Sequence, residues 1–157
     1  MFQEHTSIFV TFHPVDRRAA LKAISEIKAA NPQRAFHGRH QIQDNAVAAA
    51  TIALTTLTVI LETAQSCESS EVCHDVGVSL SKIPPNQILR ILLPGNTKMA
   101  ADARLSKNLA AQGVEMVPFD QPTITDALMR LDFLGRYELK LRQAVVSRAM
   151  VSGGCNR

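Results

Sequence analysis

The sequence predicts a single α/β domain with a parallel β-sheet. Short apolar runs alternate with segments of helical periodicity along most of the chain, and the connections are long enough to cross over between parallel strands. A chain of 157 residues can bury its own core, and 46% hydrophobic with 20% charged residues is typical of globular proteins. We therefore expect one open sheet of four to five strands with helices on both faces.

Four short runs rich in Val, Ile, Leu and Phe predict the strands. Each is too short for an ordinary helix and is bounded by turn residues or by a helical pattern. The runs are Ser7–Phe12, Leu57–Leu61, Ile88–Leu93 and Val114–Val117. Parallel strands that are covered on both faces are buried, so six of their side chains are expected in the core. These six are Ile8, Val10, Val59, Leu61, Ile91 and Leu93.

Two helices are predicted in the first third of the chain. The first ends near Ala30, because Asn31-Pro32 stops it, and the second can be capped by Asp44 or Asn45. One face of the second helix is formed by Val47, Ala50, Thr51 and Leu54. The polar segment between the two helices, Gln33–Asn45, is expected to be an exposed and mobile loop in which Arg39 is available to a partner or an anionic ligand.

Further helices are indicated by apolar residues that recur every three or four positions. They carry Val72, Val76 and Leu80, then Leu105 and Leu109, then Ile124, Leu128 and Leu131. Thr97 can cap the second of these helices, and Gly113 stands where a left-handed residue commonly ends a helix.

Positive charge is concentrated near the C-terminus. The formal net charge is +3, whereas six basic and two acidic residues from Arg130 onward give that segment +4 (six minus two). We divide the chain into an α/β domain, residues 1–135, and a basic C-terminal helix and tail, residues 136–157, which packs on the domain or extends from it.

Several classes of protein are disfavoured by composition. No basic region followed by an apolar stretch opens the chain, and its longest apolar-rich stretch is shorter than a membrane span, so a cytoplasmic protein without a membrane span is expected. Aromatic residues make up 4% of the chain, which argues against the stacking platforms of single-strand nucleic-acid binders. The three cysteines are an odd number, and we expect free thiols.

Common catalytic and binding motifs are incomplete or missing. Gly95-Asn96-Thr97-Lys98 lacks the upstream glycine of a phosphate-binding loop, no Gly-x-Gly-x-x-Gly follows the first strand, and no Gly-x-Ser-x-Gly is present. Cys67, Cys73 and His74 include only one adjacent pair of metal-ligand types, so no metal site is expected.

Four segments, taken in order, are similar to a Toll/interleukin receptor (TIR) domain. IFVTFHPVDRRAALKAI resembles the family's first strand, turn and helix, with Asp16 at the family's acidic position. DNAVAAATIALTTLTVILE is similar to its second helix and third strand. Ser70 to Asp75 resembles the family's Ser-x-Trp-Cys-x-x-Glu entry to the third helix, and ILRILLPGN its fourth strand. The resemblance covers about Ser7 to Asn96 and implies a flavodoxin-like parallel sheet.

The resemblance also implies where chemistry would take place. Val76 occupies the position at which NAD-cleaving members of the family carry their catalytic Glu, and Val72 occupies that of the family's Trp. The nearest acids are Asp75 and Glu71, which are the candidate catalytic residues. A nucleotide bound as in the family would contact Phe12, His13, Asp16 and Arg39.

Two functions follow from the resemblance. The first is an assembly or signalling module, in an immune or defence pathway, that binds itself or another TIR-like domain through the segment Gln33–Asn45 and the third helix. The second is an NAD-consuming hydrolase or cyclase that uses a displaced acid, Asp75 or Glu71, with NAD as substrate and no certain cofactor. The first function is favoured, because Val76 stands where the NAD-cleaving members of the family carry a Glu.

Overall fold

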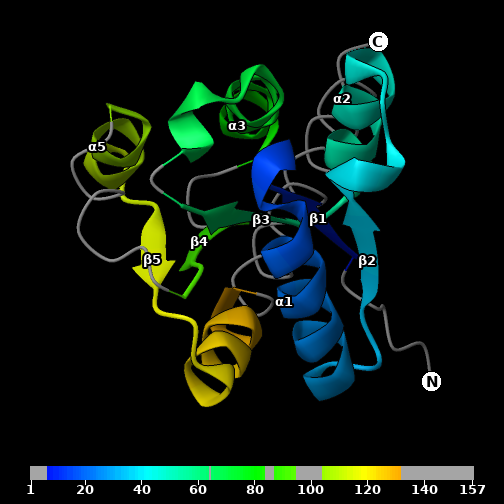
Figure 1. Cartoon of the computed structure of the whole chain (residues 1–157), viewed down its shortest axis with the longest axis vertical. Helices are drawn as coiled ribbons and strands as arrows, with labels where there is room; N and C mark the ends of the chain where they lie inside the picture. The colour runs from blue at the N-terminus through cyan, green and yellow to red at the C-terminus, as the bar shows by residue number, and fades with distance from the viewer. Residues whose placement is uncertain (1–6, 64, 84–86, 95–103, 132–157) are drawn as a thin grey trace, which may run out of the picture.

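Five parallel strands form one sheet in the order β2-β1-β3-β4-β5 in the computed structural model of the protein. The structure describes residues 7–63, 65–83, 87–94 and 104–131. The strands are β1 (Ser7–Thr11), β2 (Ala35–Gly38), β3 (Leu57–Glu62), β4 (Ile88–Leu92) and β5 (Glu115–Val117). The sequence order reverses at β1, which lies between β2 and β3 (Figure 1). This order is that of the flavodoxin-like fold, as predicted.

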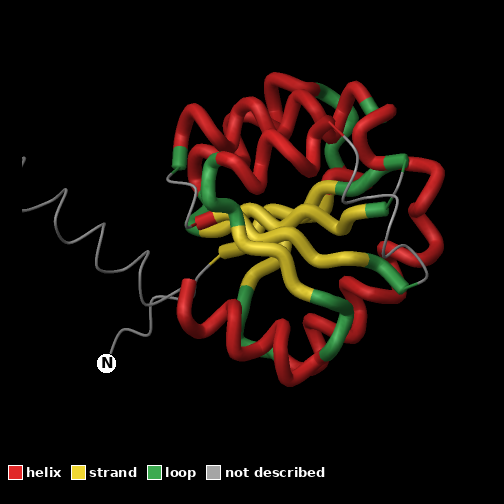
Figure 2. The backbone as a smooth tube through the Cα atoms, turned by 90° about the vertical axis from the view of Figure 1, so that its left-hand side faces the viewer, coloured by secondary structure: helices red, strands yellow, loops and turns green. Residues whose placement is uncertain are grey.

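Helices cover both faces of the sheet (Figure 2). The helices α1 (Arg17–Ala30) and 121–131 lie on one face, and α2 (Asn45–Leu54), α3 (Ser70–Lys82) and α5 (Arg104–Ala111) lie on the other (Figure 1). Three short 3-10 helices follow the carboxyl ends of strands: η1 (Pro14–Asp16), η2 (Arg39–Gln41) and η3 (Ser66–Glu68).

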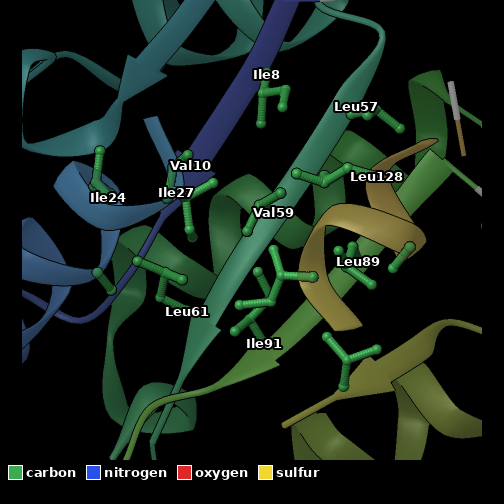
Figure 3. Close-up of a cluster of buried hydrophobic side chains, with 14 of the residues drawn as sticks. Ile8, Val10, Ile24, Ile27, Leu57, Val59, Leu61, Leu89, Ile91 and Leu128 are labelled. Atoms are coloured by element: carbon green, nitrogen blue, oxygen red, sulfur yellow. The ribbon is translucent and has the colours of Figure 1, made fainter. Parts of the chain in front are cut away.

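Strand alternation divides the interior into two cores. Side chains such as Val10 and Val59 point toward α1 and the helix at 121–131, and they form the larger apolar cluster with Ile24 and Leu128 (Figure 3). Their neighbours along the strands point toward α2 and α3, where Phe9 packs with Ala48 and Ile52. The six side chains predicted to lie in the core, Ile8, Val10, Val59, Leu61, Ile91 and Leu93, are all buried, so this prediction is confirmed.

The segment Gln33–Asn45 differs from the expected loop. Its residues Ala35–Gly38 form the edge strand β2, whose register pairs Ile8 with Phe36 and Val10 with Gly38. The strand has no apolar run, because an edge strand needs little burial and takes its backbone hydrogen bonds from one neighbour. Sequence periodicity therefore could not identify it.

The buried face of the helix α2 is not the face predicted from the sequence. Val47 and Leu54, which share the predicted face, are 52% and 84% exposed, whereas Ala48 and Ile52 are buried against Phe9. Nearly every residue of this Ala-rich helix is apolar, so periodicity does not select the buried face.

Several predictions lie outside the described residues. These are the cap at Thr97, the segment Gly95–Lys98, and the basic helix and tail at 136–157. Within the described part of the chain, none of the helices is long and apolar enough to cross a membrane.

We predict opposite effects of alanine at two glycines. Gly77 lies on the exposed side of α3, and a methyl group there would meet no atom within 4 Å, so Gly77→Ala should raise the free energy of unfolding by about 0.5–1 kcal/mol. Gly113 ends α5 with φ +79°, so Gly113→Ala should lower it by about 1–2 kcal/mol. Urea denaturation measures both changes, and a loss of stability on Gly77→Ala would contradict the prediction.

Candidate functional site

The candidate site lies at the carboxyl ends of β1 and β2. In open parallel sheets, ligands bind beyond the carboxyl ends of the strands at the point where strand order reverses, and here that point is β1. The segments that follow β1 and β2 are η1 and η2, and the helix α3 covers one side of this edge. Of the six predicted site residues, Glu71 and Asp75 lie on α3, Asp16 on η1 and Arg39 on η2, and the two others, Phe12 and His13, lie between β1 and η1.

A buried carboxylate, that of Asp75, is at the centre of the site. Its side chain is 0% exposed. Thr11 Oγ1 donates a hydrogen bond of 2.7 Å to Asp75 Oδ2, and Arg39 Nε lies 3.1 Å from the same oxygen. His74 Nδ1 lies 3.0 Å from Oδ1, so both oxygens have polar partners. The carboxylate thus joins α3 to the end of β1 and to η2.

The expectation that Arg39 is exposed is wrong, because its side chain is only 2% exposed. Its guanidinium donates hydrogen bonds to the backbone oxygen of Ile42, at 2.6 Å, and to the side chain of Asn45. It also faces the carboxylate of Asp75. A buried cation is costly unless it is paired and hydrogen-bonded. Nη1 and Nη2 donate these two hydrogen bonds, whereas Nε pairs with Asp75 by charge and makes no hydrogen bond to a described residue. Since Asp75 lies on a different element far along the chain, no local pattern could have shown the pairing.

The residues after β1 are held by local contacts. His13 Nδ1 accepts a hydrogen bond of 3.0 Å from the backbone of Val15 and so caps η1. Thr63 Oγ1 donates to Asp16 Oδ2 at 2.6 Å, which ties η1 to the segment after β3. Phe12 is buried in the apolar cluster on the α1 face, away from the α3 face on which Thr11 meets Asp75. The structure therefore places the predicted site residues on two sides of the sheet.

The other candidate acid, Glu71, lies in the first turn of α3 and is half-buried. No hydrogen bond or ion pair joins it to another residue of the described chain. Glu71 and Asp75 are four positions apart, so they lie on neighbouring parts of one helix face. Val76 is buried and packs with Val72 and Ile60.

Two polar contacts on the α3 face were missed by the sequence reasoning. Arg90 Nε and Nη2 donate to the carboxylate of Glu62 at 2.7 and 2.8 Å, and both side chains are buried. Ser79 Oγ donates to Thr58 Oγ1 at 3.0 Å. The signal was present, because Glu62 and Arg90 are single charges in the otherwise apolar segments LTVILE and ILRILL. Opposite charges on neighbouring buried strands indicate a pair.

His40, next to Arg39 in η2, lies on the opposite side of the sheet. Its ring centroid is 5.7 Å from that of Phe12, and the ring packs so closely on Gly38 that a methyl group at Gly38 would come within 2.3 Å of it. The pKa of His40 is lowered from its ordinary value of 6.5, first by burial and then by the positive charges of Arg17 and Lys28.

Metal ligands do not converge in the described residues, where no group of three His, Cys, Asp or Glu side chains could hold an ion.

Comparisons with known proteins identify no family for this chain. No protein-family model matches the chain, and no curated protein matches it. Among solved structures, a diflavin flavoprotein A3 from Nostoc sp. is similar at 15% sequence identity, covers 70% of each chain and has a TM-score of 0.45. The flavodoxin-like assignment of this chain depends on its own strand order.

We predict that Asp75→Asn strongly destabilises the fold, because it leaves the buried Arg39 cation without its counter-charge. Removing one partner of a buried pair costs about 3–5 kcal/mol. The matched control is Glu71→Gln, the same chemical change one turn earlier on α3, which should cost less than about 1 kcal/mol, the usual size of a charge effect near a helix N-terminus. If urea denaturation gave equal decreases in the free energy of unfolding for the two variants, the pairing of Asp75 with Arg39 would not stabilise the fold.

We also predict a pH dependence of stability that comes from His40. Its pKa is lower in the folded state than the value of 6.5 expected when unfolded, so the unfolded chain binds more protons between these two pKa values. The free energy of unfolding should therefore fall as the pH decreases below about 6.5. In His40→Gln the decrease between pH 7.5 and 5.5 should be smaller, and identical slopes for both proteins would contradict this origin.

Proposed function

We propose that this domain is a TIR-like assembly module, acting in an immune or defence pathway by binding a second copy of itself or another TIR-like domain. The similarity of the segments from Ser7 to Asn96 to that family, and the flavodoxin-like strand order, support the proposal. Neither observation alone identifies a function, because many unrelated functions share this fold.

The main support for the proposal is that no free acid stands at the family's catalytic position or directly beside it. Val76 occupies that position and is part of the core beneath α3. The adjacent acid, Asp75, is fully buried and is committed to Thr11, Arg39 and His74. A catalytic carboxylate must reach its substrate within about 2.6–3.2 Å. For Asp75 to reach a ribose hydroxyl, its pairing with Arg39 would have to be broken.

An exposed apolar face on α2 supports a role in binding. Val47 and Leu54 are seven residues apart, which is close to two helical turns, so they lie on the same side of the helix. Both are more than half exposed, and α2 directly follows the segment Gln33–Asn45 that the family resemblance assigns to contacts. Such side chains gain free energy when a partner covers them.

A second function, NAD cleavage with a displaced acid, is favoured by one observation only. Glu71 is half-buried and has no hydrogen bond or ion pair to another described residue, so its carboxylate is available where that of Asp75 is not. If the domain consumes NAD, we propose Glu71 as the acid, with His13 and Asp16 from the segment after β1 beside the substrate.

We predict that the purified protein self-associates through the α2 face. Sedimentation velocity at increasing concentration should show dimers or larger species, and Leu54→Lys or Val47→Lys should weaken association at least about tenfold, since each places a charge in an apolar contact. Met129→Lys is the control, because Met129 is 62% exposed on the helix at 121–131, on the other face of the sheet.

Two results would count against the assembly module. One is a protein that stays monomeric at all concentrations, alone and mixed with TIR-like domains. The other is release of nicotinamide from NAD that Glu71→Gln abolishes and a neighbouring change such as Ser70→Ala does not, which would establish the enzymatic alternative.

A further inference from the structure

A cavity of about 260 Å³ lies between α1 and the edge strand β2. Val10 of β1 and Phe36 of β2 contribute to its walls, as do Leu21 and Ile24 of α1. Because Val10 faces α1 while the next residue, Thr11, faces α3, the cavity and the Asp75 carboxylate are on opposite faces of the sheet. The cavity is therefore separate from the candidate site described above.

The lining of the cavity combines an apolar wall with a polar, cationic rim. The side chains of Ser25, Lys28 and Gln41 line it and are exposed, so the cavity opens to solvent on their side. Lys28 Nζ lies 6.0 Å from the ring centroid of Phe36, which places an ammonium group over the apolar wall. None of the lining residues is acidic.

His40 completes the rim and is held in place from two sides. Its ring packs on Gly38 and lies beside Phe12. The Nδ1 atom is buried, and no described residue forms a hydrogen bond with it. Burial and the charges of Arg17 and Lys28 lower the pKa of His40, which disfavours the protonated ring. The local positive charge thus comes from Lys28 and Arg17, and no acid in the lining balances it.

The size and chemistry of the cavity define the class of ligand. Its volume is slightly below the range of about 300–1,000 Å³ for pockets that hold drug-sized ligands, so a smaller molecule is required. A hydrocarbon part would bury the apolar wall, and an anion would pair with the ammonium group at the rim.

We propose that this cavity binds a small amphipathic carboxylate, with its hydrocarbon part against Phe36, Leu21 and Ile24 and its carboxylate at Lys28. The cavity lies on the face of the sheet opposite the proposed assembly residues Val47 and Leu54, and its lining includes Phe36, His40 and Gln41 of the segment Gln33–Asn45. It also adjoins η2, whose Arg39 side chain is bound to Asp75.

The test uses octanoate as the probe in an NMR titration of the full chain. Saturable shifts should appear at Lys28, Phe36 and His40, with a dissociation constant on the order of 1 mM, as expected for about ten heavy atoms. Lys28→Met should weaken binding about tenfold. Lys22→Met removes the same charge from an exposed position of α1 outside the cavity, and it should bind octanoate as the unaltered protein does.

Three results would overturn the proposal. The first is the absence of saturable shifts at the cavity residues. The second is an equal loss of affinity in Lys28→Met and Lys22→Met, which would indicate general attraction of anions to a basic protein. The third is equal binding of heptylamine, which has the same hydrocarbon chain and the opposite charge. Because Lys28 is exposed, the variant should fold, and its spectrum without ligand verifies this.

Discussion

The buried ion pair between Asp75 and Arg39 is the interaction on which the arrangement of this domain depends. It joins α3 to η2, and the hydrogen bond from Thr11 joins the same carboxylate to β1. Either charge alone in the interior would be strongly unfavourable, so the two elements that carry them must dock in one relative position. The edge strand β2 ends at Gly38, and Arg39 is the next residue. The ion pair of Arg39 with Asp75 therefore also fixes the position at which β2 ends.

The two faces of the sheet are stabilised in different ways. The α1 face is an apolar cluster, in which close packing is the main constraint. The α3 face adds buried polar contacts to a smaller apolar cluster: Asp75 with Thr11, Ser79 with Thr58, and Arg90 with Glu62. Polar contacts tolerate few alternatives in geometry. The first two specify the position of α3 above β1 and β3, and the third joins β4 to β3. The Asp75 carboxylate, which holds α3 in place through these contacts, is therefore not free to bind a substrate.

Much of the fold could be predicted from the sequence, whereas the site could not. Four strands and six core positions follow from apolar runs such as those containing Val10 and Val59, because burial requires apolar side chains at those places. The strand β2 and the buried face of α2 escape such reasoning, since an edge strand needs no apolar run and an Ala-rich helix has no distinct apolar stripe. Arg39 stands in a polar, glycine-containing segment, which predicts exposure. Its partner Asp75 is distant in sequence, and only the tertiary structure brings the two charges together.

Asp75 serves the fold through Arg39, and a double-mutant cycle tests this role most directly. The free energies of unfolding of Arg39→Met, Asp75→Asn and the double variant, compared with that of the unaltered protein, give the coupling between the two side chains. Residues in direct contact within one polar network show couplings of about 0.5–3 kcal/mol, and we predict a value of at least about 1 kcal/mol, with the double variant less destabilised than the sum of the single ones. A coupling indistinguishable from zero would contradict the account and leave the Asp75 carboxylate open to another role.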